Sequence, residues 1–167
     1  QNPICWVCCM AMVTSHRQNR SASVGEFAGG FEPGSASIPN IANNLEHFYA
    51  LLNHYGFTSV AGNATTDELE QLLINCGPLI LTHQCFGFPY GPVPSTMVGV
   101  HAVVITGLDT AINGGQAWFN NPWPTNAGGG KDKPALATQV NAAITTEQTV
   151  KDPATGAPIR CIAYLRR

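Results

Sequence analysis

The chain opens on the stretch Gln1-Asn-Pro-Ile-Cys5-Trp-Val-Cys-Cys-Met-Ala-Met-Val13. Asn2 and Pro3 are typical of a helix start, because Asn is a favoured N-cap and proline suits the first helical position. Residues 4–13 are apolar on every face of the helix that follows, a pattern typical of a helix buried within a domain. We therefore predict a central helix that carries Cys5 in its first turn.

Helical patterns continue through the first half of the chain. Residues 21–39 are rich in Gly and Ser and indicate a long loop. Apolar side chains then recur at three- and four-residue steps across residues 38–55, which predicts an amphipathic helix. Thr65 and Glu68 have the spacing of a capping box, so we expect another helix to begin there.

Strand patterns replace the helical ones after this point. A short apolar run, residues 78–82, is followed by residues 98–108, in which His101 shares one face with alternate apolar side chains. The run Asn113-Gly-Gly115 is a turn signal, and residues 117–121 return as the next strand.

The end of the chain predicts a helix around residues 135–143 and a hairpin that turns through residues 152–156 into a strand at 159–165. Helices that come first and an antiparallel sheet that follows make an α+β arrangement. The length of 167 residues fits one domain with its own core, and no linker or repeat divides it. We predict a single α+β domain over residues 1–167. Because the chain begins without Met, we also expect it to have been cut from a longer precursor.

The composition argues against several classes of function. Hydrophobic residues make up 44% of the chain and charged residues 11%, against about 25% charged residues in an average domain. The net charge of −2 offers no positive surface for nucleic acid or for an anionic membrane. No apolar run approaches the roughly 18 residues of a membrane-spanning helix. We therefore expect neither a nucleic-acid partner nor a membrane span.

Six cysteines leave several interpretations open. Buried free thiols and the disulfides of a secreted protein are both compatible with this number. Cys5-Trp-Val-Cys8 also matches the C-x-x-C pattern of redox and zinc sites. A thioredoxin-like site needs a strand directly before it, for which four residues are too few. A zinc site needs a second ligand pair, for which His83-Gln-Cys85 is a poor match, so we predict neither a metal nor a cofactor.

A thiol, an imidazole and an amide in this chain point to nucleophilic chemistry. A cysteine in a first helical turn feels the positive end of the helix dipole, which favours the nucleophilic thiolate. His101 stands in a rigid strand and can take the thiol proton, provided that an acceptor on its other ring nitrogen fixes the tautomer. Asn121 lies on the next strand and can supply that acceptor, whereas Asn120 alternates to the opposite face and is the second choice. We predict a catalytic triad of Cys5, His101 and Asn121.

These residues resemble the papain-like cysteine proteases, and more narrowly the bacterial secreted-effector branch that includes the avirulence-type proteases of plant pathogens. The resemblance rests on four blocks in the order of the family, namely residues 1–12, Leu72-Leu73 with Gly77-Pro-Leu79, Gly99-Val-His-Ala-Val-Val-Ile-Thr-Gly107 and Asn121-Pro-Trp123. It implies a helical left lobe whose central N-terminal helix carries Cys5, and a right lobe of antiparallel sheet that carries His101 and Asn121. It also implies a cleft between the lobes, and acyl transfer to the cysteine with His101 as base and then acid.

The chain departs from this family at two positions. In the family an upstream Gln donates to the oxyanion, and Gln1 is the candidate here, although it stands closer to Cys5 than in relatives. The backbone N–H of Cys5 and the side chain of Asn2 are further candidate donors. Many relatives carry Asp where this chain has Asn121, and an amide brings no negative charge to stabilise an imidazolium.

The leading hypothesis is a cysteine peptidase of a bacterial effector or toxin, secreted or delivered into another cell, that acts on a protein or peptide substrate. The same triad also serves deamidases, transglutaminases and peptidoglycan amidases, so these are alternatives. A third hypothesis is an inactive papain-like module that binds a partner, with Cys5 and His101 as core residues. A delivered toxin needs a cognate inhibitor or immunity protein in the producing cell, so we expect such a partner as well.

Overall fold

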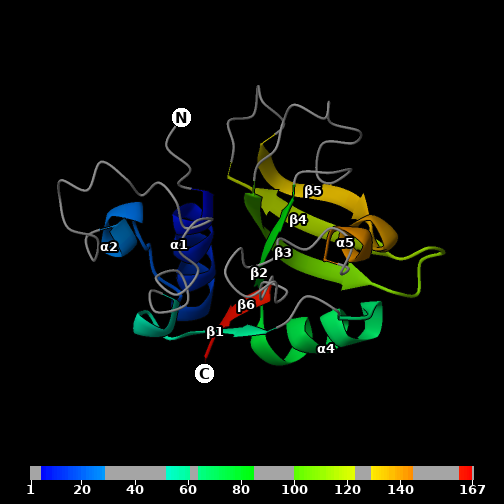
Figure 1. Cartoon of the computed structure of the whole chain (residues 1–167), viewed down its shortest axis with the longest axis horizontal. Coiled ribbons are helices and arrows are strands. Elements are labelled where there is room, and N and C mark those ends of the chain that lie inside the picture. The colour runs from blue at the N-terminus through cyan, green and yellow to red at the C-terminus, as the bar shows by residue number, and fades with distance from the viewer. Residues whose placement is uncertain are drawn as a thin grey trace, which may run out of the picture.

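The computed structural model describes residues 5–28, 52–60, 64–84, 100–122, 129–144 and 162–166. Its helices include α1 (Cys5–Gln18), α2 (Val24–Ala28), α4 (Thr66–Cys76) and α5 (Ala137–Ile144). Its strands are β1 (Phe57–Val60), β2 (Leu79–Gln84), β3 (Val100–Asp109), β4 (Gln116–Asn121), β5 (Gly130–Leu136) and β6 (Ile162–Leu165). Helices packed on an antiparallel sheet confirm the predicted α+β class (Figure 1).

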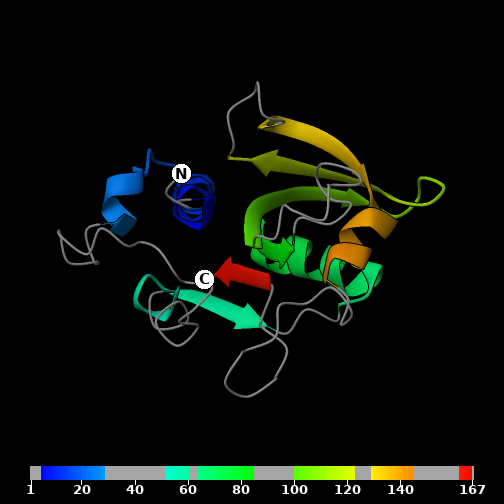
Figure 2. The same ribbon diagram turned by 45° about the horizontal axis from the view of Figure 1, so that its top comes forward.

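The six strands form one sheet in the order β1-β6-β2-β3-β4-β5, and every neighbouring pair is antiparallel. β2, β3, β4 and β5 follow one another both in the chain and in space. β6 comes from the end of the chain and inserts between β1 and β2. α1 and α2 lie on one side of the molecule, with β3, β4, β5, α4 and α5 on the other (Figures 1 and 2).

Alternate side chains of the central strands bury against different helices. On β3, Ala102 and Val104 belong to the core that contains the apolar side chains of α1. Val103 and Ile105 belong to a second core, together with Leu69 of α4 and Val140 of α5. A strand buried on both faces needs apolar residues at every position. This explains the unbroken Ala-Val-Val-Ile run that follows His101.

The predicted central helix is confirmed and runs on to Gln18. Because it contacts the sheet on one side and α2 on the other, it buries side chains around most of its circumference, as its uniformly apolar sequence requires. These are Trp6, Val7, Cys9, Met10, Ala11, Val13 and Thr14. α1 therefore holds its first turn against the sheet.

The capping box at the start of α4 is confirmed and gives a first stability prediction. Thr65 Oγ1 accepts a hydrogen bond from the Glu68 N–H, and the Glu68 carboxylate accepts one from the Thr65 N–H. Thr65→Ala removes the first of these, so we expect the free energy of unfolding in urea to fall by about 1 kcal/mol. Thr138→Ala, at an exposed position of α5, is the control and should change it by less than about 0.5 kcal/mol. Equal losses in the two variants would contradict the capping role.

The prediction of a long loop over residues 21–39 is wrong for its first part, because α2 occupies Val24–Ala28. The reason is a second capping arrangement. Glu26 accepts a hydrogen bond from the Ser23 N–H and pairs with Arg20 at 2.8 Å. The spacing of Ser23 and Glu26 is that of a capping box, so the start of α2 could have been predicted from the sequence.

Two strands were not predicted. β1 has only four residues, too few to reveal an alternating pattern. β5 contains Pro134 and begins at Gly130, and both residues disfavour strands. Proline is tolerated here because β5 lies at the edge of the sheet.

The hairpin predicted at the end of the chain is wrong for residues 162–165. The strand itself is present as β6, but β1 and β2 occupy its two edges, so no hairpin partner can pair there. The helix predicted around residues 135–143 is confirmed as α5, although it begins two residues later. Of the helix predicted over residues 38–55, residues 52–54 are helical, Tyr55 lies in the turn that follows, and residues 38–51 lie outside the described residues. Within the described ranges, no helix has both the length and the apolar character to cross a membrane.

Candidate active site

Cys5 begins the described part of α1, and its thiol is partly buried. The sulfur lies within hydrogen-bonding reach of the backbone N–H of Ala102 on β3. That nitrogen belongs to the peptide bond that joins His101 to Ala102. The packing of α1 against β3 therefore brings Cys5 beside the backbone of His101, although the two residues are far apart in the sequence.

His101 and Asn121 form a buried polar pair. His101 is the second residue of β3 and Asn121 the last residue of β4, and their side chains are only 2% and 3% exposed. The imidazole Nε2 lies 2.9 Å from the Asn121 Oδ1. Buried polar groups are stable only when they are hydrogen-bonded, so each member of this pair makes the burial of the other possible.

The hydrogen bond also assigns the tautomer of His101. An amide oxygen only accepts, so Nε2 must carry the proton and donate it to Oδ1. In the neutral ring the lone pair then resides on Nδ1. His101 is therefore held with Nδ1 as its basic nitrogen, which is the atom that can receive a proton from a thiol.

Asn120 points away from this pair. Its Oδ1 accepts a hydrogen bond from the backbone N–H of Asp132 at 2.8 Å. The pairing of β4 with β5 shifts register between Phe119 and Asn121, so the Asn120 side chain serves a backbone donor at this irregularity. The neighbouring residues thus have separate partners, and Asn121 rather than Asn120 contacts the imidazole.

Burial sets the protonation of the two reactive groups. It raises the pKa of the Cys5 thiol, which the backbone N–H groups of Ala102 and Trp6 lower to a smaller extent and the nearby Cys8 raises further. Burial also lowers the pKa of His101, against the opposing effect of the hydrogen bond to Asn121. The N–H groups at the start of the helix lower the Cys5 pKa as expected, but the expected net lowering is wrong, because loss of solvation is the larger effect. The favoured states are therefore a neutral Cys5 thiol and a neutral His101 imidazole.

A comparison with protein families matches residues 1–132 to the family described as papain-like cysteine protease AvrRpt2. The chain belongs to this family. The match contains α1, β3 and β4, and with them all three residues of the predicted triad. It confirms the family predicted from the sequence blocks around Cys5 and His101. A comparison with curated proteins gives no match.

The papain-like family places an oxyanion donor upstream of the cysteine, and this chain leaves that donor unassigned. Gln1 and Asn2, the side-chain candidates, lie outside the described residues. The backbone N–H of Cys5 is the candidate that lies within them. The zinc alternative also reaches beyond them, since it would require Cys85 and the side chain of His83.

One contact of this papain-like site was not predicted from the sequence, namely that of the Ala102 N–H with the Cys5 sulfur. Every residue except proline carries such a donor, so no side-chain pattern marks it. It becomes visible only through the packing of α1 on β3. A backbone donor in a buried strand is rigid, and it stabilises negative charge on sulfur without needing a charged side chain.

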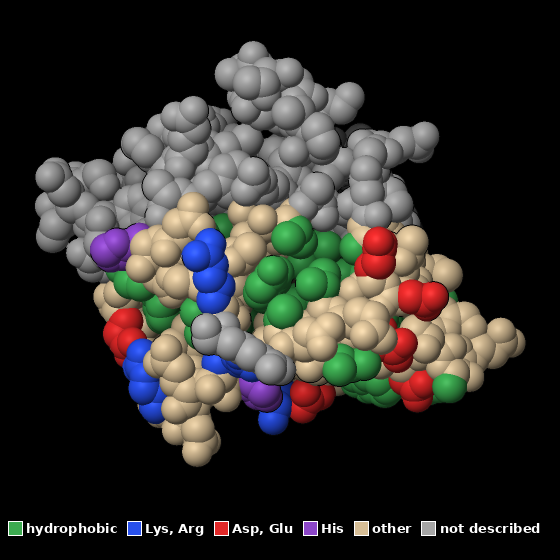
Figure 3. Space-filling view, turned by 90° about the horizontal axis from the view of Figure 1, so that it is seen from below, with side chains coloured by type: hydrophobic (Ala, Val, Ile, Leu, Met, Phe, Trp, Pro, Cys, Tyr) green, Lys and Arg blue, Asp and Glu red, His purple; other side chains and the backbone are tan. Residues whose placement is uncertain are grey.

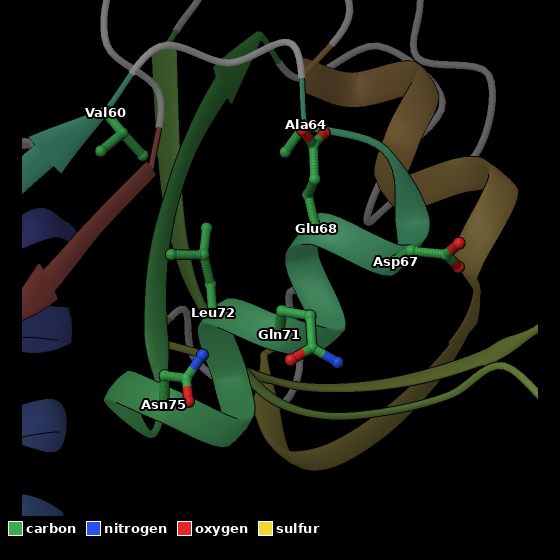
Figure 4. Close-up of a pocket in the computed structure, with 7 residues that line it drawn as sticks. All are labelled: Val60, Ala64, Asp67, Glu68, Gln71, Leu72 and Asn75. Carbon is green, nitrogen blue, oxygen red and sulfur yellow. The ribbon is translucent and has the colours of Figure 1, made fainter.

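The papain-like chain also has a hollow beside α4. A cavity of about 550 Å³ lies between α4 and the end of β1, lined by Val60, Ala64, Asp67, Glu68, Gln71, Leu72 and Asn75 (Figure 4). Seen from below, hydrophobic side chains gather on this face with acidic side chains beside them (Figure 3). None of the lining residues is a thiol or an imidazole, so the cavity is separate from the candidate active site.

Proposed function

We propose that this chain is a cysteine peptidase in which Cys5 attacks the peptide carbonyl, His101 transfers the proton and Asn121 holds the imidazole. The observation that carries the proposal is the buried 2.9 Å hydrogen bond from His101 to Asn121, on the strand whose backbone lies beside the Cys5 sulfur. Membership of the papain-like cysteine protease family supports the reaction class.

The protonation states argue for attack from a neutral pair. As the sulfur bonds to the carbonyl carbon, His101 Nδ1 takes the thiol proton, and the Ala102 N–H stabilises the charge that develops on sulfur. The imidazolium then protonates the leaving amine, which leaves a thioester on Cys5. Water hydrolyses the thioester with His101 again as the base, and the thiol is restored. Asn121 keeps Nε2–H directed at its own oxygen throughout.

We extend the proposal to the architecture and the setting of the enzyme. The position of α1 and α2 beside the sheet supports two lobes within one domain over residues 1–167 (Figure 1). For the oxyanion we propose the backbone N–H of Cys5 with a side-chain donor from Gln1. The avirulence-type name of the family supports an effector that is secreted or delivered into another cell and acts on a protein there. A cognate inhibitor in the producing cell belongs to the same proposal.

A second candidate function is a catalytically silent papain-like module that binds a protein partner. The raised pKa of Cys5 and the lowered pKa of His101 favour it, because both shifts oppose formation of a thiolate–imidazolium pair. The two candidates differ in whether His101 activates the thiol.

The deciding experiment is the rate of Cys5 alkylation by iodoacetamide across pH, followed by mass spectrometry in the wild type and in His101→Ala. If His101 acts as base, Cys5 in the wild type should label at pH 7 about tenfold faster or more than in the variant, the equivalent of one pKa unit. Cys8 is the internal control, since it lies three residues along the same helix and should label equally in both proteins. Equal Cys5 rates in the two proteins would contradict the peptidase and favour the binding module.

A further inference from the structure

The C-x-x-C pattern of Cys5 and Cys8 has no role in the proposed peptidase mechanism. Both cysteines are free thiols, both are partly exposed, and both lie at the start of α1. The two side chains are near one another, since the charge of Cys8 contributes to the raised pKa of Cys5. Two partly exposed thiols at this spacing are candidates for a disulfide bond.

Helix geometry allows a bond between them. With a rise of 1.5 Å per residue and a Cα radius near 2.3 Å, residues three apart have Cα atoms about 5 Å from each other. Disulfides span Cα separations of roughly 4.4–6.8 Å. The Cβ atoms of such residues are about 5–6 Å apart and must approach to about 4 Å. Closing this difference requires the helix to tighten locally between Cys5 and Cys8, as it does in a 3₁₀ turn, where residues three apart are eclipsed.

Cys9 is the competing partner, since a residue four along the helix is also within reach. Its side chain is completely buried in the core that joins α1 to the sheet. Burial raises its pKa well above the ordinary value, which suppresses its thiolate. The pKa of Cys8 is raised as well, but Cys8 remains partly open to solvent. Cys8 can therefore ionise and move with less cost than Cys9.

We propose that Cys8 is a resolving thiol for Cys5, so that a hydroperoxide converts the pair into a reversible disulfide that blocks the active site. The proposal rests on the nucleophilic role proposed for Cys5. A bond that pulls the first turn tight is strained, and strained disulfides are readily reduced. The pair therefore acts as a protective switch rather than as a structural staple.

The chemistry balances with hydrogen peroxide as the oxidant. As His101 Nδ1 takes the Cys5 thiol proton, the sulfur attacks one peroxide oxygen, an S–O bond forms, the O–O bond breaks, and hydroxide leaves. The product is Cys5 sulfenic acid. The Cys8 thiolate then attacks the Cys5 sulfur, the S–S bond forms, the S–O bond breaks, and hydroxide leaves as water after taking a proton. The two thiols have lost two electrons to the peroxide, and an added dithiol returns them.

The test compares reduced wild type, Cys8→Ser and Cys9→Ala after exposure to hydrogen peroxide, with dimedone present in parallel samples to trap sulfenic acid. Peptide mass spectrometry should find a Cys5–Cys8 bond, seen as the loss of two hydrogens and two alkylation sites, in wild type and Cys9→Ala. In Cys8→Ser, dimedone-labelled Cys5 should accumulate, and longer exposure should give sulfinic acid. After treatment with dithiothreitol, wild type should recover about tenfold more alkylatable Cys5 than Cys8→Ser, because sulfinic acid is not reduced.

Three outcomes overturn the proposal. Equal sulfenic acid at Cys5 in wild type and Cys8→Ser would show a reactive nucleophile without a resolving partner, and only this inference would fail. A bond from Cys5 to Cys9 would assign the role to the wrong residue. A Cys5 that resists both peroxide and iodoacetamide at pH 7 would defeat this inference and the proposed peptidase together.

Discussion

Cys5→Ala is expected to abolish peptide-bond hydrolysis, with a loss of roughly 10⁴-fold or more in kcat/KM. The variant retains the positions of His101 and Asn121 but has no atom that can form the thioester. Only a sulfur is removed from a side chain at the start of a helix, so the fold should persist. Thermal unfolding of the variant should stay close to that of the wild type.

Because the natural substrate is defined only as protein or peptide, the measurement should sample many sequences at once. A peptide library from a digested proteome is incubated with each protein, and new N-termini are identified by mass spectrometry. New termini are expected with wild type and with Cys8→Ala, the matched control three residues along α1. They should be missing with Cys5→Ala.

The same data separate the alternative chemistries. A deamidase would convert Gln to Glu and raise peptide masses without new termini, again only when Cys5 is present. Chain cleavage that persists in Cys5→Ala would contradict the assignment of the nucleophile. A wild type that leaves the library unchanged and labels its Cys5 independently of His101 would support the binding module.

The elements predicted correctly from sequence are those with local signals. The uniformly apolar run after Cys5 predicts a buried helix, and the box at Thr65 and Glu68 predicts the start of α4. The Gly-Gly pair that ends at Gly115 predicts the turn between β3 and β4, where both glycines have positive φ. A Cβ on Gly115 would approach that of Ala137 to 2.6 Å, so the turn also packs tightly against α5.

The elements that were missed depend on partners far away in the chain. β1 has no pattern of its own and exists as a strand because β6 pairs with it. The edges of β6 are filled by β1 and β2, which no local turn signal could indicate. Long-range pairing of this kind carries no nearby sequence signature.

The candidate site likewise has features that the local sequence predicts and features that depend on distant parts of the chain. Strand alternation was sufficient to favour Asn121 over Asn120, and the two side chains do have separate partners. The direction in which the Cys5 pKa shifts was not predictable from the sequence, because it depends on how deeply β3 and its neighbours bury the first turn of α1. Local dipole arguments omit that desolvation.

Substitutions of Asn121 are expected to distinguish two effects on catalysis, namely the orientation of the His101 imidazole and the stabilisation of its protonated form. Asn121→Ala removes the acceptor that fixes the tautomer, and we expect kcat/KM to fall about 10²-fold, less than the roughly 10⁴-fold seen when a triad holds the wrong tautomer. Asn121→Asp keeps an acceptor at the same place and adds a negative charge. That charge stabilises the imidazolium and raises the pKa of His101 from its lowered value.

The pH profile of kcat/KM then reports the state from which attack begins. In wild type, burial keeps His101 neutral below its ordinary pKa of 6.5, so the acidic limb should lie below pH 6.5. If a neutral imidazole is the base, Asn121→Asp moves this limb to higher pH. Asn120→Asp is the matched control, since its carboxylate would face the Asp132 N–H and should move the limb far less. If the acidic limb stays in place and the alkaline limb moves up, attack begins from a thiolate–imidazolium pair, and the neutral-pair mechanism is wrong.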